Sequence, residues 1–314
     1  MQRGFGKVIL LGEHAVVYGY PAIAAALQDI AVDAVAVPAT QATLSIEPWN
    51  KVIVAGNSST EQDLALQRGF EALLACYGET PCKLHVRARV ALPPGAGLGC
   101  SAALGVAIVK AIDEAMQLSR SAFEVAELSL HWERVFHGNP SGVDSAVAAH
   151  GGVLRFAKHQ PIRMLRLAKP VHFVVAISHQ AASTKTMVDS VAAQHARDPE
   201  RVTKVFEAIA VLVDKSQTAL ETGSVSELGS YLNLNHAMLS SLLLSTPDIE
   251  SLCEVARQSG ALGAKLTGAG GGGAMLALAA DMTQATSIQK ALAALSSQCF
   301  TVTVHESSIL EGSR

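Results

Sequence analysis

The sequence predicts an α+β protein with two domains. Segments typical of strands and helices are mixed without the regular alternation that produces a parallel sheet. The chain has 314 residues, more than one compact core normally holds, and 49% of them are hydrophobic, enough to fill a sizeable interior. We expect the two domains to cover residues 1–160 and 161–314.

The first half of the chain opens with β structure. Short apolar stretches predict strands at residues 7–11, 15–18, 31–37 and 42–47. Ser59 and Gln62 have the spacing of a capping box, which predicts the start of a helix. That helix should end near Cys76, because Gly78 stands where a helix stop usually places glycine.

The remainder of the first half predicts one strand followed by helices. Residues 83–92 alternate apolar and polar side chains, the pattern of a half-buried strand. A helix should follow over residues 101–116. Ser121 and Glu124 form a second capping box, and the helix that they begin should end near His137.

The second half mixes apolar strands with longer helices. Apolar runs predict strands at residues 172–178, 274–280 and 299–305. Helical patterns occur at residues 198–222, 225–243, 248–259 and 283–295. The dipeptide Asp198–Pro199 marks the start of the longest helix, because aspartate caps a helix and proline is tolerated in its first turn.

The composition excludes several classes of partner. A net charge of −3 gives no basic excess of the kind that nucleic-acid binding requires. No run of about 18 apolar residues is present, so no membrane span is expected, and Glu13 and His14 interrupt the N-terminal run that resembles a signal peptide. The five cysteines are scattered without a Cys-x-x-Cys pair, which favours a reducing compartment. We therefore expect a soluble, cytoplasmic protein.

The stretch LPPGAGLGCSAALG, residues 92–105, is a glycine-rich loop that runs into a helix. Its glycines cost conformational entropy, which close approach of the backbone to a ligand would offset. Amides of such a loop and the positive end of the helix dipole favour phosphate. No lysine stands in the Walker A position, and a dinucleotide fingerprint would need a strand directly before it and an acidic residue after it. We expect a phosphate loop; a flexible connector is the alternative.

The turn HGNPSGVD, residues 137–144, delivers Asp144 to the start of a new element. On its own, Asp144 would most simply cap that element as a helix. Glu133 lies nearby in the last turn of the preceding helix, where the dipole disfavours a carboxylate. A cation such as Mg²⁺ bound with phosphate would compensate for this charge. Solvation of Glu133 at the surface is the alternative.

Three further stretches place polar groups in apolar or glycine-rich surroundings. Lys7, Glu13 and His14 are the titratable groups of GKVILLGEHAVVYG and need partners if that stretch is buried. The run KLTGAGGGG, residues 265–273, implies that backbone packs closely against backbone or ligand. The hydroxyls and ammonium of residues 183–185 could hold an anion, although an ordinary helix cap explains them better on local grounds.

Taken together, these motifs resemble the GHMP kinases, a family named for galactokinase, homoserine kinase, mevalonate kinase and phosphomevalonate kinase. GKVILLGEHAVVYG, PPGAGLGCSAA, HGNPSGVD and KLTGAGGGG stand in the family's order along the whole chain. GEHAVVYG and HGNPSGVD are most similar to the mevalonate kinase branch. The resemblance implies a ribosomal-S5-like N-terminal domain and a ferredoxin-like C-terminal domain, which agrees with the α+β prediction.

The resemblance also implies a role for each matching residue. The loop would bind the phosphates of ATP through Pro94, Gly95, Ala96, Gly97, Leu98, Gly99, Cys100, Ser101 and Ala102. Ser101 and Glu133 would hold Mg²⁺. Asp144 would accept or steer the proton of the acceptor's primary hydroxyl, and Lys7 would favour the alkoxide. Cys100 departs from the serine that many relatives carry there, so we expect it only to pack.

The acceptor implied by the same resemblance is mevalonate, placed with the help of Glu13, His14 and Thr184. Another small-alcohol kinase of the family, such as a phosphomevalonate kinase, is one alternative. A catalytically inactive binding protein is a second, against which the presence of every expected catalytic and metal-binding residue argues. The sequence leaves open whether the chain forms a homodimer.

Overall fold

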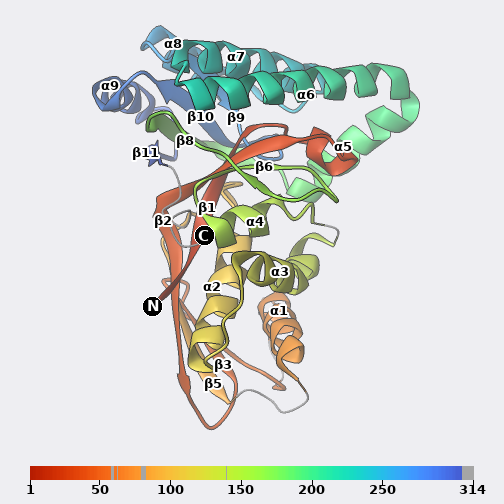
Figure 1. Cartoon of the computed structure of the whole chain (residues 1–314), viewed down its shortest axis with the longest axis vertical. Coiled ribbons are helices and arrows are strands. Elements are labelled where there is room, and N and C mark those ends of the chain that lie inside the picture. The colour runs from red at the N-terminus through yellow and green to blue at the C-terminus, as the bar shows by residue number, and fades with distance from the viewer. Residues whose placement is uncertain (58–59, 62, 79–82, 139, 306–314) are drawn as a thin grey trace. The chain divides into compact units, whose positions relative to one another are not determined.

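The computed structural model describes residues 1–57, 60–61, 63–78, 83–138 and 140–305. The chain divides into two compact units (Figure 1). Unit 1 contains residues 1–7, 29–94 and 99–151, and unit 2 contains residues 8–28, 95–98 and those from 152 onward. Strands β1 (Gln2–Leu11) and β2 (Ala22–Pro38) contribute residues to both units. The α+β class is confirmed, whereas the domain boundary near residue 160 stays a prediction.

Unit 1 contains the part of the sheet built on the second half of β2. Its strands are ordered β4 (Lys51–Val54), β3 (Thr43–Glu47), β5 (Leu84–Val90) and β2. β3 runs parallel to β5, and the other neighbours are antiparallel. Buried and less buried side chains alternate along β5, as the pattern of residues 83–92 predicts. The short strand β4 was not predicted.

The helices of unit 1 are α1 (Leu64–Leu74), α2 (Cys100–Ala115), α3 (Ala122–His137) and α4 (Val143–His150) (Figure 1). Trp132 of α3 is fully buried between α1 and α2. An added Cβ at Gly69 of α1 would lie 2.7 Å from the indole ring, and one at Gly105 of α2 would lie 2.8 Å from it. Glycine at these two positions therefore allows the three helices to approach closely, and this packing fixes the position of the neighbouring Glu133.

The start of α3 and the end of the α1 segment lie where the sequence predicts a helix start and a helix end. In α3 the amide of Glu124 donates to Ser121 Oγ at 3.3 Å, and the amide of Ser121 donates to the Glu124 carboxylate at 2.7 Å, which confirms that capping box. Gly78 follows the 3-10 turn Ala75–Tyr77 that ends the α1 segment, but its φ of +106 and ψ of 177 differ from the αL conformation of the predicted glycine stop. Ser59 and Gln62 lie outside the described residues.

Unit 2 is built on an antiparallel sheet. Its strands are ordered β11 (Gln298–Val304), β8 (Val171–Ala181), β10 (Gly272–Ala279) and β9 (Gly263–Leu266). Helices α8 (Pro247–Gln258) and α9 (Met282–Leu292) pack on this sheet. Every residue of β10 is buried, which explains its uniformly apolar sequence. The first half of β2 pairs separately with β6 (Val153–Phe156), which pairs with β7 (Arg163–Met164).

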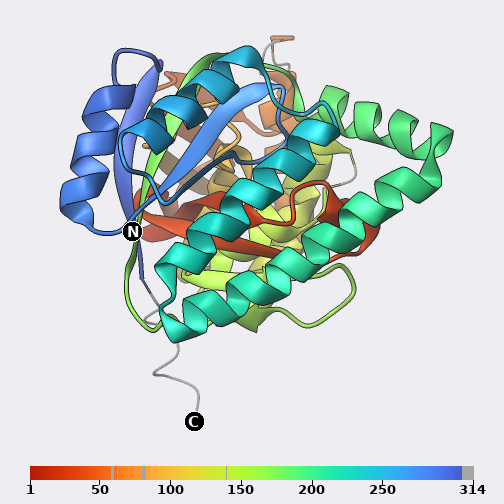
Figure 2. The same cartoon turned by 90° about the horizontal axis from the view of Figure 1, so that it is seen from above.

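The remaining helices of unit 2 are α5 (Thr184–Arg197), α6 (Pro199–Thr222) and α7 (Val225–Ser241). α6 and α7 lie side by side as the two long green-to-teal helices of Figure 2. Asp198 caps α6 and Pro199 begins it, as predicted. None of the helices in the described part of the chain is long and apolar enough to cross a membrane.

One predicted strand is wrong. Residues 15–18 form a short 3-10 helix instead of a strand. The chain turns at His14, whose φ of +59 lies in the left-handed region, and the amide of Ala15 bonds back to the carbonyl of Glu13 at 2.7 Å. The residues of this stretch are apolar because Ala15 and Val16 are buried, not because the backbone is extended.

Candidate active site

Lys7 and Asp144 form an ion pair in unit 1. Lys7 Nζ lies 3.3 Å from Asp144 Oδ1. The lysine side chain is 5% exposed, whereas the aspartate side chain is 33% exposed. Asp144 belongs to the first turn of α4, but the N-cap of that helix is Gly142. The interpretation of Asp144 as a simple helix cap is therefore wrong, and its carboxylate remains accessible beside a buried positive charge.

Glu133 lies in the same part of unit 1 and is almost completely buried. Ser101 Oγ, from the first turn of α2, donates a hydrogen bond to its Oε1. Burial raises the pKa of the Glu133 carboxyl to about 7; the Ser101 hydrogen bond and Lys7 act in the opposite direction, and the charge of Asp144 adds to the rise. The alternative of a solvated surface glutamate is therefore wrong.

His137 is a neighbour of this site that sequence reasoning missed. Its Nε2 lies 3.5 Å from Ser101 Oγ and 3.8 Å from Glu133 Oε2. Burial lowers the pKa of His137, so the ring is predominantly neutral at neutral pH. Its position four residues after Glu133 places both side chains on one face of α3, and this spacing was the available signal.

The loop of residues 94–102 has the backbone conformation expected of a glycine-rich ligand loop. Gly95, Gly97 and Gly99 all have left-handed φ values, +74, +77 and +74. Gly95 and Gly97 are exposed, whereas the intervening Ala96 and Leu98 are buried. Exposed glycines therefore alternate with buried residues along this loop, and its role in binding phosphate stays a prediction.

The junction of this loop with α2 contacts the lysine of the ion pair. Gly99 is the N-cap of α2, and an added Cβ there would lie 2.8 Å from Cγ of Lys7. Glycine at this position therefore gives Lys7 room to reach Asp144. The next residue, Cys100, has a thiol whose pKa burial and Glu133 raise to about 12, so it stays protonated and suits a packing role.

Unit 2 holds the predicted acceptor residues Glu13 and His14. Glu13 is fully buried and forms an ion pair with Lys265, which is also fully buried. Asn235 Nδ2 donates to the second carboxylate oxygen of Glu13 at 3.1 Å. His14 Nε2 donates to the carbonyl of Ala269 at 2.8 Å, and burial lowers the pKa of this imidazole. Sequence reasoning did not identify Lys265 or Asn235 as partners.

Thr184, the third predicted acceptor residue, lies exposed in the first turn of α5. The cap of that helix is Ser183, whose Oγ accepts from the amide of Thr186 at 3.1 Å. The helix-cap explanation of this segment is thus confirmed for Ser183. The role of Thr184 in binding stays a prediction.

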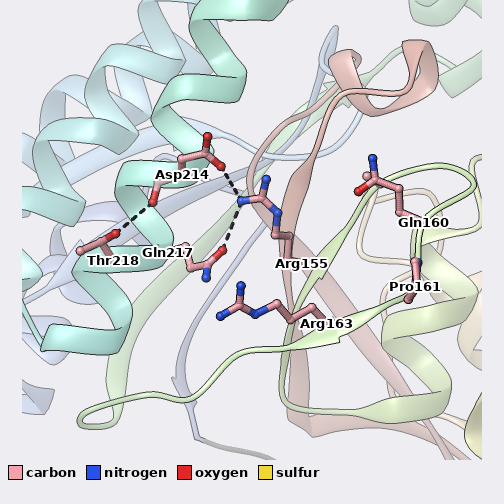
Figure 3. A pocket seen from close by; sticks show the side chains of 8 residues that line it. Arg155, Gln160, Pro161, Arg163, Asp214, Gln217 and Thr218 are labelled. Carbon is pink, nitrogen blue, oxygen red and sulfur yellow. Dashed lines mark hydrogen bonds and ion pairs between the residues drawn. The ribbon is translucent and has the colours of Figure 1, made fainter.

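A polar cavity of about 470 Å³ in unit 2 shares no residue with these sites (Figure 3). Arg155 and Arg163 are cross-strand neighbours in β6 and β7. Arg155 Nη1 lies 2.5 Å from Asp214 Oδ1, and Arg163 Nη2 lies 3.5 Å from Glu221 Oε1. Because each arginine has a carboxylate partner on α6, the cavity is best explained by the docking of that helix on the β6–β7 pair.

Comparison with known families identifies both halves of the chain. The family model described as GHMP kinases N terminal domain matches residues 65–152, and the model described as GHMP kinases C terminal matches residues 216–298. The mevalonate kinase of Pyrococcus horikoshii is 34% identical over 293 residues, 87% of this chain and 86% of that protein. The mevalonate kinase of Aeropyrum pernix is 30% identical, over 98% of this chain and 96% of that protein.

Solved structures of mevalonate kinases have the same overall fold as this chain. L. major mevalonate kinase in complex with R-mevalonate is 28% identical and superimposes with a TM-score of 0.85, covering 97% of this chain and 95% of that one. The Methanococcus jannaschii mevalonate kinase gives a TM-score of 0.81 at 23% identity over 96% of this chain and 97% of that one, which supports the fold alone. The predicted combination of N- and C-terminal folds is therefore confirmed.

Proposed function

The chain belongs to the GHMP kinase family, and we propose that it is a mevalonate kinase. It would transfer the γ-phosphoryl group of ATP to the primary hydroxyl of mevalonate and form 5-phosphomevalonate. Its curated relatives of 30–34% identity that carry this name support the choice within the family. The observation that carries the chemistry is the Lys7–Asp144 ion pair, which presents an accessible carboxylate beside a buried cation.

Asp144 and Lys7 are the groups that act on the acceptor hydroxyl. Phosphoryl transfer requires little covalent chemistry from the protein, but the nucleophile must be placed and its proton removed. The partly exposed carboxylate of Asp144 accepts or steers that proton. The ammonium of Lys7, 3.3 Å from the carboxylate, stabilises negative charge that develops on the acceptor oxygen.

Ser101 and Glu133 fit a magnesium site. A hydroxyl and a carboxylate are hard oxygen ligands, and Mg²⁺ typically takes only one or two protein ligands together with water and substrate phosphates. Within the described residues there is no cluster of three or more His, Cys, Asp or Glu side chains that could form a full protein cage, which agrees with a site completed by ATP. When bound, Mg²⁺ supplies charge neutralisation for the phosphates.

The loop of residues 94–102 binds the ATP phosphates in this proposal. The exposed left-handed glycines and the N-terminus of α2, a helix of 16 residues, both favour an anion. Glu13, His14 and Thr184 place the acceptor, either by contact with it or by holding the groups that contact it.

A coupled assay that follows ADP release tests the function directly. The purified chain is supplied with Mg-ATP and, separately, with mevalonate, phosphomevalonate, galactose or homoserine. We expect the highest kcat/KM with mevalonate. A preference for phosphomevalonate would favour that kinase instead, and the absence of turnover with every acceptor, despite ATP binding, would favour an inactive family member.

A further inference from the structure

Residues 9–14 are attached to residues 265–269 by a series of polar contacts within unit 2. The amide of Ile9 donates to Thr267 Oγ1 at 2.9 Å, and that hydroxyl donates to the carbonyl of Ile9 at 2.9 Å. Lys265 binds the Glu13 carboxylate, and the Ala269 carbonyl accepts from His14. Alternate residues of the second segment therefore each hold one residue of the first.

Both oxygens of the Glu13 carboxylate are hydrogen-bonded by buried partners. One oxygen is bound by the ammonium of Lys265 and the other by the amide of Asn235. The side chains of Glu13 and Lys265 are both 0% exposed. Lys265 also donates to the carbonyl of Leu266 at 2.5 Å, which holds the ammonium in place. Because the Glu13 side chain is 0% exposed, an acceptor molecule could reach its carboxylate only if the residues that cover it moved.

His14 differs from Glu13 in the way that it is held. Its φ of +59 is costly for a residue with a Cβ and persists only when neighbouring contacts determine it. The preceding residue, Glu13, is anchored by the side chains of Lys265 and Asn235. The His14 ring is itself held by the hydrogen bond from Nε2 to the carbonyl of Ala269. The anchor on Glu13 thus fixes the left-handed backbone from which His14 projects.

We propose that Lys265 and Asn235 are positioning residues that hold Glu13 as a buried anchor, so that Glu13 orients His14 and does not itself contact the acceptor. This inference rests on the proposed function, because it assigns roles within the acceptor site of that reaction. It also changes the role that the family resemblance implies for Glu13, from ligand to support.

A double-mutant cycle distinguishes an anchor from a ligand. Lys265→Met and Glu13→Gln each leave one buried charge without its partner, and each should lower the melting temperature and raise the KM for mevalonate by about tenfold or more. The double variant Glu13→Gln/Lys265→Met removes both charges, so its mevalonate KM should return to within about threefold of the wild-type value. If Glu13 binds the acceptor directly, the double variant keeps the high KM of Glu13→Gln even when its melting temperature recovers, and the proposal is overturned.

Two asparagines of α7 provide a matched pair of variants. Asn235→Leu removes the donor to Glu13, whereas Asn233→Leu removes contacts to the Leu262 carbonyl and the Ala264 amide of the β9 region. We expect Asn235→Leu to raise the mevalonate KM by about tenfold with an unchanged ATP KM, and Asn233→Leu to lower only the melting temperature. If the two variants change the mevalonate KM equally, Asn235 has only a general structural role, and its assignment as a positioning residue is overturned.

The experiment keeps its meaning if the single variants do not fold. The double variant is then compared with wild type alone: a mevalonate KM within about threefold supports the anchor, and a rise of about tenfold or more overturns it. Wild-type turnover with mevalonate is measured first, so failure of the proposed function is seen separately. If wild type shows no turnover with mevalonate, the melting temperatures of wild type, the two single variants and the double variant still show whether Glu13 and Lys265 are coupled.

Discussion

Lys7 and Asp144 lie 3.3 Å apart, and the two members of this pair are unequally exposed. The lysine is buried under the start of α2, where Gly99 contacts its aliphatic chain. The aspartate retains one third of its exposure at the start of α4. When a carboxylate takes the proton of a bound hydroxyl, the negative charge passes to the hydroxyl oxygen. A buried cation next to an accessible carboxylate is suited to stabilise that charge.

Asp144→Asn should reduce kcat by about 10²–10⁴-fold, because the amide cannot accept the hydroxyl proton. ATP affinity, measured by isothermal titration calorimetry, should stay close to wild type. Asp33→Asn is the control, since it removes a carboxylate that only pairs with Arg3 at 2.8 Å in the same unit. Near-wild-type turnover of Asp144→Asn would remove Asp144 from the mechanism.

Gly99→Ala and Gly95→Ala separate backbone strain from displacement of Lys7. Both glycines have φ +74, so alanine should cost each variant a similar stability, about 1–2 kcal/mol. Only the Cβ at position 99 would meet Lys7, whereas an added Cβ at Gly95 meets no atom within 4 Å. We expect Gly99→Ala to lose about tenfold more kcat than Gly95→Ala in steady-state assays. Identical kcat values would show that Lys7 tolerates the contact.

Glu133→Gln should weaken the dependence of turnover on Mg²⁺. The amide keeps the shape of the side chain but loses the charge that suits a divalent cation. The Mg²⁺ concentration for half-maximal activity should rise by about tenfold or more, a loss found even when outer-shell partners of a metal are removed. Titration of activity with Mg²⁺ at fixed ATP measures this shift, and an unchanged midpoint would place the metal elsewhere.

Lys110 predicts a pH dependence of stability. Its ammonium donates to the carbonyls of Arg3 and Ala149 at 3.1 and 2.9 Å, and burial lowers its pKa from 10.5 to about 8. Between these values the unfolded chain binds more protons than the folded one, so the free energy of unfolding rises with pH. The rise should reach about 3 kcal/mol between pH 8 and 10.5, relative to Lys110→Met.

Urea denaturation of the two proteins at several pH values measures this difference. Subtracting the Lys110→Met curve removes the contribution of the other lysines and tyrosines, which titrate in the same range in both proteins. Parallel curves would show that Lys110 keeps its proton in the folded state.

Features whose signals lie within a few residues could be predicted from the sequence. The Ser121–Glu124 capping box and the Asp198–Pro199 helix start were both placed correctly, because cap and helix bond to each other locally. Glu133 stands out because its charge opposes the dipole of its own helix, and in the structure this carboxyl accepts a hydrogen bond from Ser101 and has a pKa that burial raises to about 7.

Features that depend on distant partners could not be predicted. Lys265 stands at the edge of a glycine run, and its partner Glu13 lies 252 positions earlier. Burial of a lysine depends on a paired acid, and no local pattern reveals which acid that is. The turn at residues 15–18 was missed for a related reason, since the left-handed His14 is held by the carbonyl of Ala269.

The bonds between Ile9 and Thr267 join positions 258 apart, and this separation bears on how the chain is made. Residues 8–28 are synthesised before most of their compact unit, which apart from residues 95–98 continues only from residue 152. At about 5–20 residues per second, roughly 13–50 s pass between synthesis of Glu13 and of Lys265. During that interval residues 9–14 are without their partners at residues 265–269, so chaperone occupancy during translation should be high over this segment.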